Sequence, residues 1–123
     1  HTWGGNQLNG PRQIRNVVER YPDVRFLMGH SCYGEWEEAA RLATDFPHVY
    51  CEMTAAFECR GTLELFVERG ASQRILFGTD LPWFSPLHGI GCVLSADITD
   101  DDRHNILHRN AEHLLQPHLK LAR

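Results

Sequence analysis

The 123-residue sequence predicts an α/β protein built around a parallel sheet. Short apolar segments alternate along the chain with longer segments in which apolar residues recur at helical spacing. The short segments are mostly apolar and lack period-2 alternation, which fits strands buried on both faces. Strands separated by single helices form right-handed βαβ units, so these strands are expected to run parallel.

The first half of the chain is predicted to contain two helices, each followed by a strand. After a glycine- and asparagine-rich loop over 4–10, Pro11 begins a helix that ends at Pro22. The apolar segment 24–28 is the first clear strand. A helix over 36–46 and a strand over 49–53 follow.

The second half continues the same alternation. Thr62 is expected to cap a helix that ends near Gly70, and residues 75–77 form the next strand. The stretch 81–98, with two prolines and two glycines, is expected to be a row of turns. Thr99 then caps a final helix, whose predicted buried residues are Leu107, Ala111, Leu114 and Leu115, with Pro117 ending it.

The composition excludes several classes of protein. The net charge of −4 argues against a nucleic-acid partner, because phosphate binding needs a clustered basic face. No apolar run approaches the ~20 residues that span a bilayer, and no signal peptide is recognisable. The four cysteines form no C-x-x-C pair, so we expect reduced, buried thiols in a cytoplasmic protein.

Polar side chains stand where the predicted strands end. His30 and Asp80 each follow a strand, and His1 ends a third if 1–3 is the tail of a strand. The carboxyl ends of parallel strands meet at one edge, where α/β proteins gather their function. Imidazole and carboxylate are ligands for Zn²⁺ and similar ions. Each residue also has a plain structural interpretation: a histidine satisfied by backbone groups, an aspartate that forms a turn, and a chain terminus.

The sequence also contains four recognisable segments: G-H-S at 29–31, V-Y-C-E at 49–52, R-I-L-F-G-T-D-L-P at 74–82 and N-A-E-H-L-L at 110–115. With the opening His1-Thr2 and Y-P-D-V at 21–24, they resemble the second half of the amidohydrolase-related family. The branch in question includes aminocarboxymuconate-semialdehyde decarboxylase, aromatic-acid decarboxylases and lactonases. The resemblance implies the C-terminal half of a (β/α)₈ TIM barrel, with strands 6 to 8, their helices and the tail of strand 5. Residues 1–123 would then be a single partial domain, although by length alone an open doubly wound sheet fits better.

The resemblance implies a role for each strand-end residue. His1 matches the strand-5 histidine, a metal ligand. His30 matches the strand-6 histidine, which binds metal in binuclear members and serves as acid/base or substrate contact in mononuclear members. Asp80 matches the strand-8 aspartate, a metal ligand that also orients or deprotonates the attacking water. The family's H-x-H pair on strand 1 has no counterpart here, and the chain starts at His1 rather than Met, so we expect a piece of a longer enzyme.

Three further residues are candidate substrate contacts. Trp83 follows the Asp80 strand end, His88 lies in the loop beyond it, and Arg60 follows the 49–53 strand, where it could meet a substrate carboxylate. Packing against the final helices is the alternative for Trp83. His104 and His108 lie four apart on the final helix but lack the glutamate of H-E-x-x-H, so a solvated face is expected there.

These observations predict a divalent-metal-dependent enzyme, with zinc as the expected ion and a small molecule as substrate. It would hydrolyse an ester, lactone or amide, or decarboxylate a small carboxylic acid as a carbon–carbon lyase. The chain alone is expected to be inactive, and a homo-oligomer is left open. The alternative is a non-catalytic open α/β binding domain, in which His30 and Asp80 lie apart or contact backbone partners.

Overall fold

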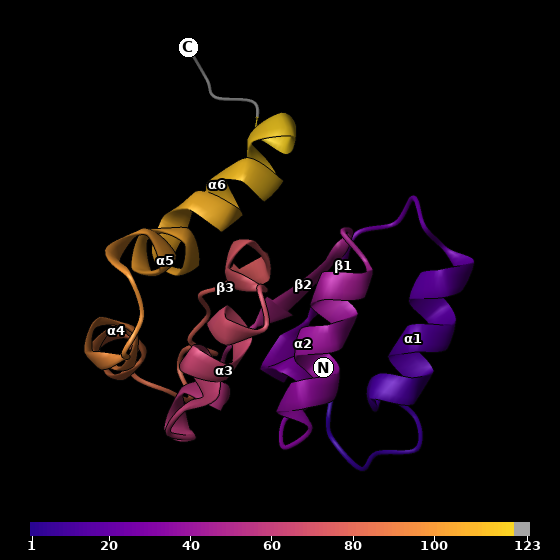
Figure 1. The fold of residues 1–123 in the computed structure, drawn as a ribbon, viewed down its shortest axis with the longest axis horizontal. Helices are drawn as coiled ribbons and strands as arrows, with labels where there is room; N and C mark the ends of the chain where they lie inside the picture. The colour runs from indigo at the N-terminus through magenta and orange to yellow at the C-terminus, as the bar shows by residue number, and fades with distance from the viewer. Residues whose placement is uncertain (120–123) are drawn as a thin grey trace.

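A computed structural model describes residues 1–119, which form a three-stranded parallel sheet with helices packed around it (Figure 1). The strands β1 (Phe26–Met28), β2 (Val49–Glu52) and β3 (Ile75–Leu76) lie side by side in the order of the sequence. The prediction of a parallel α/β fold is therefore confirmed.

The first three helices alternate with the strands. α1 (Pro11–Arg20) precedes β1, α2 (Trp36–Asp45) joins β1 to β2, and α3 (Thr62–Glu68) joins β2 to β3. In Figure 1, α2 lies between α1 and α3. Within residues 1–119, no helix combines the length and hydrophobicity needed to cross a membrane.

Three more helices follow β3: α4 (Pro86–Ser95), α5 (Asp100–His104) and α6 (Asn110–Leu115). Short 3₁₀ segments and one π-helical turn complete the chain. They are η1 (Gly29–Cys32), η2 (Ala56–Glu58), η3 (Ser72–Arg74), the π-helical η4 (Asn105–Arg109) and η5 (Gln116–His118).

One face of the sheet packs into the main core. Met28, Cys51 and Ile75 are buried there, and they share this face because Met28 pairs with Cys51 and Cys51 with Ile75 across the strands. The core also contains residues of the first three helices, including Val18, Ala39, Ala43 and Phe66. The small alanines of α2 allow this helix to approach the sheet closely.

The opposite face carries Leu27, Tyr50, Glu52 and Leu76. These residues share a side, since Leu27 pairs with Tyr50 and Glu52 with Leu76. Tyr50 and Leu76 are buried against Leu114 of α6, whereas Leu27 on the edge strand is 52% exposed. Glu52 therefore lies on the face of the sheet opposite the main core.

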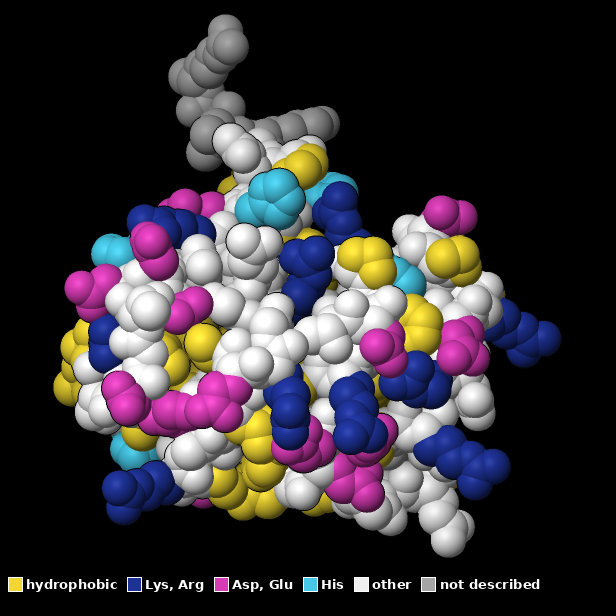
Figure 2. Space-filling view, in the orientation of Figure 1, with side chains coloured by type: hydrophobic (Ala, Val, Ile, Leu, Met, Phe, Trp, Pro, Cys, Tyr) yellow, Lys and Arg dark blue, Asp and Glu magenta, His cyan; other side chains and the backbone are white. Residues whose placement is uncertain are grey.

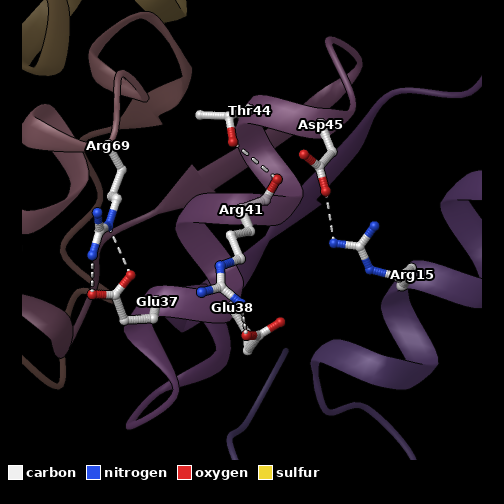
Figure 3. Close-up of polar contacts among 7 residues, drawn as sticks. All are labelled: Arg15, Glu37, Glu38, Arg41, Thr44, Asp45 and Arg69. Carbon is white, nitrogen blue, oxygen red and sulfur yellow. Dashed lines mark hydrogen bonds and ion pairs between the residues drawn. The ribbon is translucent and has the colours of Figure 1, made fainter.

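Ion pairs join α2 to its neighbours (Figure 3). Arg69 donates from Nε and Nη2 to both carboxylate oxygens of Glu37, at 2.8 and 2.7 Å, and Arg15 donates to Asp45 at 2.8 Å. Basic and acidic side chains are interspersed across the face shown in Figure 2. Exposed pairs of this kind contribute little to stability, so the buried core determines the packing.

Two predicted helix ends are confirmed in detail. Thr99 forms a capping box with Asp102, in which each side chain bonds the other residue's backbone N–H. Gly70 follows α3 with φ of +82°, and the N–H groups of Gly70 and Ala71 donate to Val67 and Phe66. These two bonds form a Schellman motif, which favours glycine at the left-handed position.

Other local predictions were wrong. The stretch 81–98 contains α4 rather than a row of turns: Pro86 occupies its first turn, and Gly89 is buried where a Cβ would press on Phe57 and Phe77 at 3.3 and 3.1 Å. The glycine thus permits close helix packing instead of breaking the helix. Gly61, not Thr62, is the N-cap of α3.

The buried face of the final helix also differs from the prediction. Ile106 and Asn110 are buried, whereas Leu115 is exposed. The π-helical turn η4 adds a residue to one turn and so rotates the residues after it relative to a regular α-helix. Pro117 lies inside the 3₁₀ segment η5 that continues the helix.

The cysteine prediction was half right. All four cysteines are free, and Cys32 and Cys51 are buried, but Cys59 and Cys92 are partly exposed.

Candidate functional site

The loops that follow the three strands contain strained backbone. Within residues 1–119, all five non-glycine residues with positive φ lie there: His30 (65°), Ser31 (48°) and Cys32 (53°) after β1, Ala55 (65°) after β2, and Asp80 (49°) after β3. Side chains disfavour this left-handed conformation by ~1–2 kcal/mol per residue. Strain of this kind clusters at functional sites, so the carboxyl edge of the sheet is the candidate site.

Neighbouring side chains hold the left-handed turn that presents His30. The backbone N–H of His30 donates to Oε2 of Glu52 at 3.2 Å, and the Ser31 hydroxyl donates to the Glu52 carbonyl at 2.7 Å. The N–H of Cys32 donates to Oγ1 of Thr2 at 2.8 Å. These hydrogen bonds offset the strain and fix the position of His30.

The imidazole of His30 is buried, with a defined set of neighbours. Its Nδ1 lies 3.2 Å from the carbonyl oxygen of Thr54, which can only accept, so Nδ1 carries the proton and Nε2 has the free lone pair. The ring of His1 lies nearly perpendicular to it, with 4.8 Å between ring centroids. Trp3 flanks the His30 ring at 5.3 Å and stacks on Tyr33 at 4.9 Å. The structure therefore brings His1 and His30 together.

Glu52 connects the ends of all three strands, and sequence reasoning left it without a role. Its carboxylate accepts the N–H of His30 after β1, and both the N–H (2.8 Å) and hydroxyl of Thr54 after β2. It also lies against the backbone of Gly78, after β3, where a Cβ would overlap it. The available signal was an acidic residue at the end of the otherwise apolar strand V-Y-C-E.

Asp80 stands at the same edge, after β3, with its side chain exposed and its carbonyl accepting the N–H of Trp83 at 2.8 Å. Residues 1–119 contain no group of three or more His, Cys, Asp or Glu side chains placed to hold a metal ion. The described part of the chain thus pairs His1 with His30 but does not join Asp80 to them. Their assignment as metal ligands and catalytic groups stays a prediction.

Two of the predicted substrate contacts share a groove. Arg60 and His88 both line a groove of about 520 Å³ between η2, the start of α3, and α4. His88 also lines a small recess together with Thr54, Gly78 and Thr79, which connects this region to the strand ends. Trp83 is 80% exposed and does not line either hollow.

A family model described as Amidohydrolase matches residues 8–116, which is most of the chain. The chain belongs to the amidohydrolase family. This amidohydrolase chain is 30% identical over 91 residues to protein fluG of Emericella nidulans, a match that covers 66% of the chain and 10% of fluG.

Solved structures show the same fold. The amidohydrolase chain is similar to an uncharacterized TIM-barrel protein from Bordetella bronchiseptica, with a TM-score of 0.77 and 26% identity over 86% of this chain and 39% of that one. It is also similar to 2,6-dihydroxybenzoate decarboxylase, with a TM-score of 0.67 and 20% identity over 82% of this chain and 37% of that one; the Rhizobium enzyme gives a TM-score of 0.64 at 18% identity. The chain thus spans less than half of each relative, and the prediction of a partial TIM barrel is confirmed.

Proposed function

We propose that this chain forms part of a divalent-metal-dependent hydrolase or decarboxylase. The observation that best supports the proposal is the pairing of His1 with the buried His30 at the strained carboxyl edge of the sheet. Active sites of TIM-barrel enzymes lie at this edge. Membership of the amidohydrolase family supports the same reading.

In this proposal His1 and Asp80 are metal ligands and His30 is the acid/base group or a further ligand. Two imidazoles and a carboxylate have the chemistry of a zinc site. When bound, a divalent metal supplies Lewis acidity and lowers the pKa of bound water. A catalytic zinc usually has three protein ligands, and residues 1–119 assemble no such group, so the fit is partial. We therefore expect weak metal binding and little or no turnover from the chain alone.

The surroundings of His30 suit proton transfer. Since the Thr54 carbonyl holds the proton on Nδ1, Nε2 is the atom that accepts or delivers a proton. Glu52 accepts a hydrogen bond from the backbone N–H of His30. Within residues 1–119 the hydrogen bond of the His30 ring is made with Thr54 and not with Glu52. In the proposal Glu52 is therefore a positioning residue.

Similarity to known decarboxylases, and Arg60 in the groove, bear on the class of substrate. Arg60, which can bind a carboxylate in a bidentate manner, lines the groove together with His88. The acidic residues Glu58, Glu64 and Asp97 line it too, so a carboxylate would have to bind at the Arg60 guanidinium. Similarity to a decarboxylase of 2,6-dihydroxybenzoate agrees with a carboxylic acid substrate. We therefore favour decarboxylation of a small carboxylic acid over hydrolysis of an ester, lactone or amide.

The first test is to read the coding sequence upstream of His1. An H-x-H motif near a first strand, with about four β/α units before His1, would support the proposal. A start codon directly before His1 would instead favour the non-catalytic α/β binding domain.

The second test is calorimetric titration of the chain with zinc, with decarboxylation of aromatic acids and hydrolysis of lactones assayed in parallel. We expect binding weaker than micromolar that falls further in His30→Asn and Asp80→Asn. Micromolar or tighter zinc with measurable turnover would contradict the expectation that the chain alone is inactive.

A further inference from the structure

The final helix carries two exposed histidines whose rings face each other. His104 ends α5 and His108 lies four residues later in the π-helical turn η4, so both project from the same side of the helix. Nδ1 of His104 lies 3.1 Å from Nε2 of His108, and the ring planes are 86° apart. Neither residue contributes to the candidate site at the sheet edge.

From this geometry we propose that His104 and His108 form a separate surface site for a transition-metal dication such as Zn²⁺. Two nitrogen ligands at about 2.05 Å from one ion are about 2.9 Å apart at a right angle and about 3.3 Å apart at the tetrahedral angle. The observed 3.1 Å falls between these values. In the ion-free chain this contact is an N–H···N hydrogen bond, and the same spacing suits a shared ion once His104 releases the Nδ1 proton to solvent or carries it on Nε2 instead.

Glu112 prepares His108 for this role. Its Oε1 lies 3.1 Å from Nδ1 of His108, one further turn along the helix. A carboxylate accepts, so the His108 proton is held on Nδ1 and the lone pair of Nε2 faces His104. Metal-binding histidines usually donate their other ring N–H to such a carboxylate, which fixes the tautomer.

The local charge also favours a cation. Residues 100–112 contain four acidic and two basic residues. Both basic side chains are engaged in ion pairs: Arg103 with Asp100 at 2.8 Å and Arg109 with Asp101 at 3.0 Å. The negative charge of Glu112, which contacts His108, is left to attract a dication toward the two imidazoles.

The site has two protein ligands, because residues 1–119 hold no group of three or more. Water completes the coordination, and the affinity is correspondingly moderate. Imidazole nitrogen selects Zn²⁺, Ni²⁺ or Cu²⁺ and not Mg²⁺, which prefers oxygen ligands.

Isothermal titration of the whole chain with ZnCl₂ tests the proposal. His104→Ala and His108→Ala should each abolish one binding event, and Glu112→Ala should weaken it ~10–100-fold. His113→Ala, an exposed histidine of the same helix, is the matched control and should leave the isotherm unchanged. MgCl₂ should give no binding heat.

A repeat in a His1→Ala, His30→Ala background separates this site from the one at the sheet edge. The event lost in His108→Ala should persist there, whether or not the proposed enzyme function is correct. An isotherm that is the same for the unaltered chain, His104→Ala and His108→Ala would overturn the site. Circular dichroism checks that each variant is folded, and the exposed helix variants are expected to fold.

Discussion

The carboxylate of Glu52 lies directly against the backbone of Gly78, so a side chain at residue 78 would overlap it. The same carboxylate accepts the backbone N–H groups of His30 and Thr54. Glu52 therefore couples the end of β3 to the turn that presents His30. A side chain added at Gly78 should displace Glu52 and so alter the position of the His30 turn.

Gly78→Ala should destabilise the chain by ~1–3 kcal/mol, because the added methyl group overpacks a site that has no free space. Urea unfolding measures the loss. Gly91→Ala is the matched control, because Gly91 is an exposed residue within α4 where a Cβ would meet no atom outside the helix's own backbone within 4 Å. The control should gain ~0.5–1 kcal/mol, since alanine is the better helix former. Equal stability of the two variants would contradict the packing described for Glu52.

Asn110→Ala should cost ~2–3 kcal/mol, because the buried Nδ2 donates to the carbonyls of Ser72 (2.8 Å) and Ile75 (2.7 Å), and the loss leaves both acceptors short of a partner. Thermal or urea unfolding reports the change. Asn105→Ala removes a single, longer bond to Ser72 of 3.3 Å at a partly exposed position and should cost less. If Asn105 proved the more important residue, the docking of α6 onto β3 would need another explanation.

The capping box at Thr99 should make stability depend on acidic pH. Hydrogen bonds from Ser72 and then Thr99 lower the pKa of Asp102. A carboxyl group whose folded-state pKa is depressed stabilises the fold above its unfolded-state pKa, about 3.9, and this contribution is lost as pH falls through the folded-state value. The unfolding free energy of Asp102→Asn should therefore fall below that of the unaltered chain at pH 7, and the gap should narrow below about pH 4.

Asp101→Asn is the control for that experiment, since Asp101 is an exposed aspartate of the same helical turn. The unfolding free energy of Asp101→Asn should differ little from that of the unaltered chain at every pH. If the difference in unfolding free energy between Asp102→Asn and the unaltered chain stayed constant from pH 7 to pH 2, the contribution of the Asp102 side chain would not be electrostatic. Thr99→Ala should cost ~1 kcal/mol at neutral pH, as loss of a helix cap does.

The four thiols should fall into two reactivity classes. Burial raises the pKa of both the Cys32 and the Cys51 thiols, whereas Cys59 and Cys92 are partly exposed and line the groove. Because the thiolate is the reactive form, an aromatic disulfide reagent should label Cys59 and Cys92 rapidly and the buried pair only on unfolding. Mass spectrometry of labelled peptides identifies the sites. Rapid labelling of Cys51 in the native chain would show that the sheet opens far more often than its packing implies.

Some of the fold could be predicted from the sequence because its causes are local. The caps at Thr99 and Gly70 rest on residues within a few positions of one another, and the apolar strands show burial directly. Recognition of the family came from short segments such as I-L-F-G-T-D-x-P. These local patterns also identified the carboxyl ends of the strands as the place for function.

The features that local patterns missed depend on distant contacts. The glycine-containing stretch 81–98 reads as turns, yet Gly89 packs against Phe57 and Phe77 and lies within α4. In the final helix, the π-helical turn η4 rotates the residues that follow it, and the buried Asn110 bonds backbone groups 35 and 38 positions away.

For the candidate site, the sequence by itself determined which residue types stand at the ends of the strands: His1, His30 and Asp80. Only the tertiary structure decided that His1 meets His30 and that Arg60 shares a groove with His88. It also decided that Glu52 bonds the turn at His30 and lies against Gly78 after β3. The physical reason is that hydrophobic periodicity specifies which face is buried, whereas contacts between side chains on different strands are fixed only when the strands pair and the loops beyond them close.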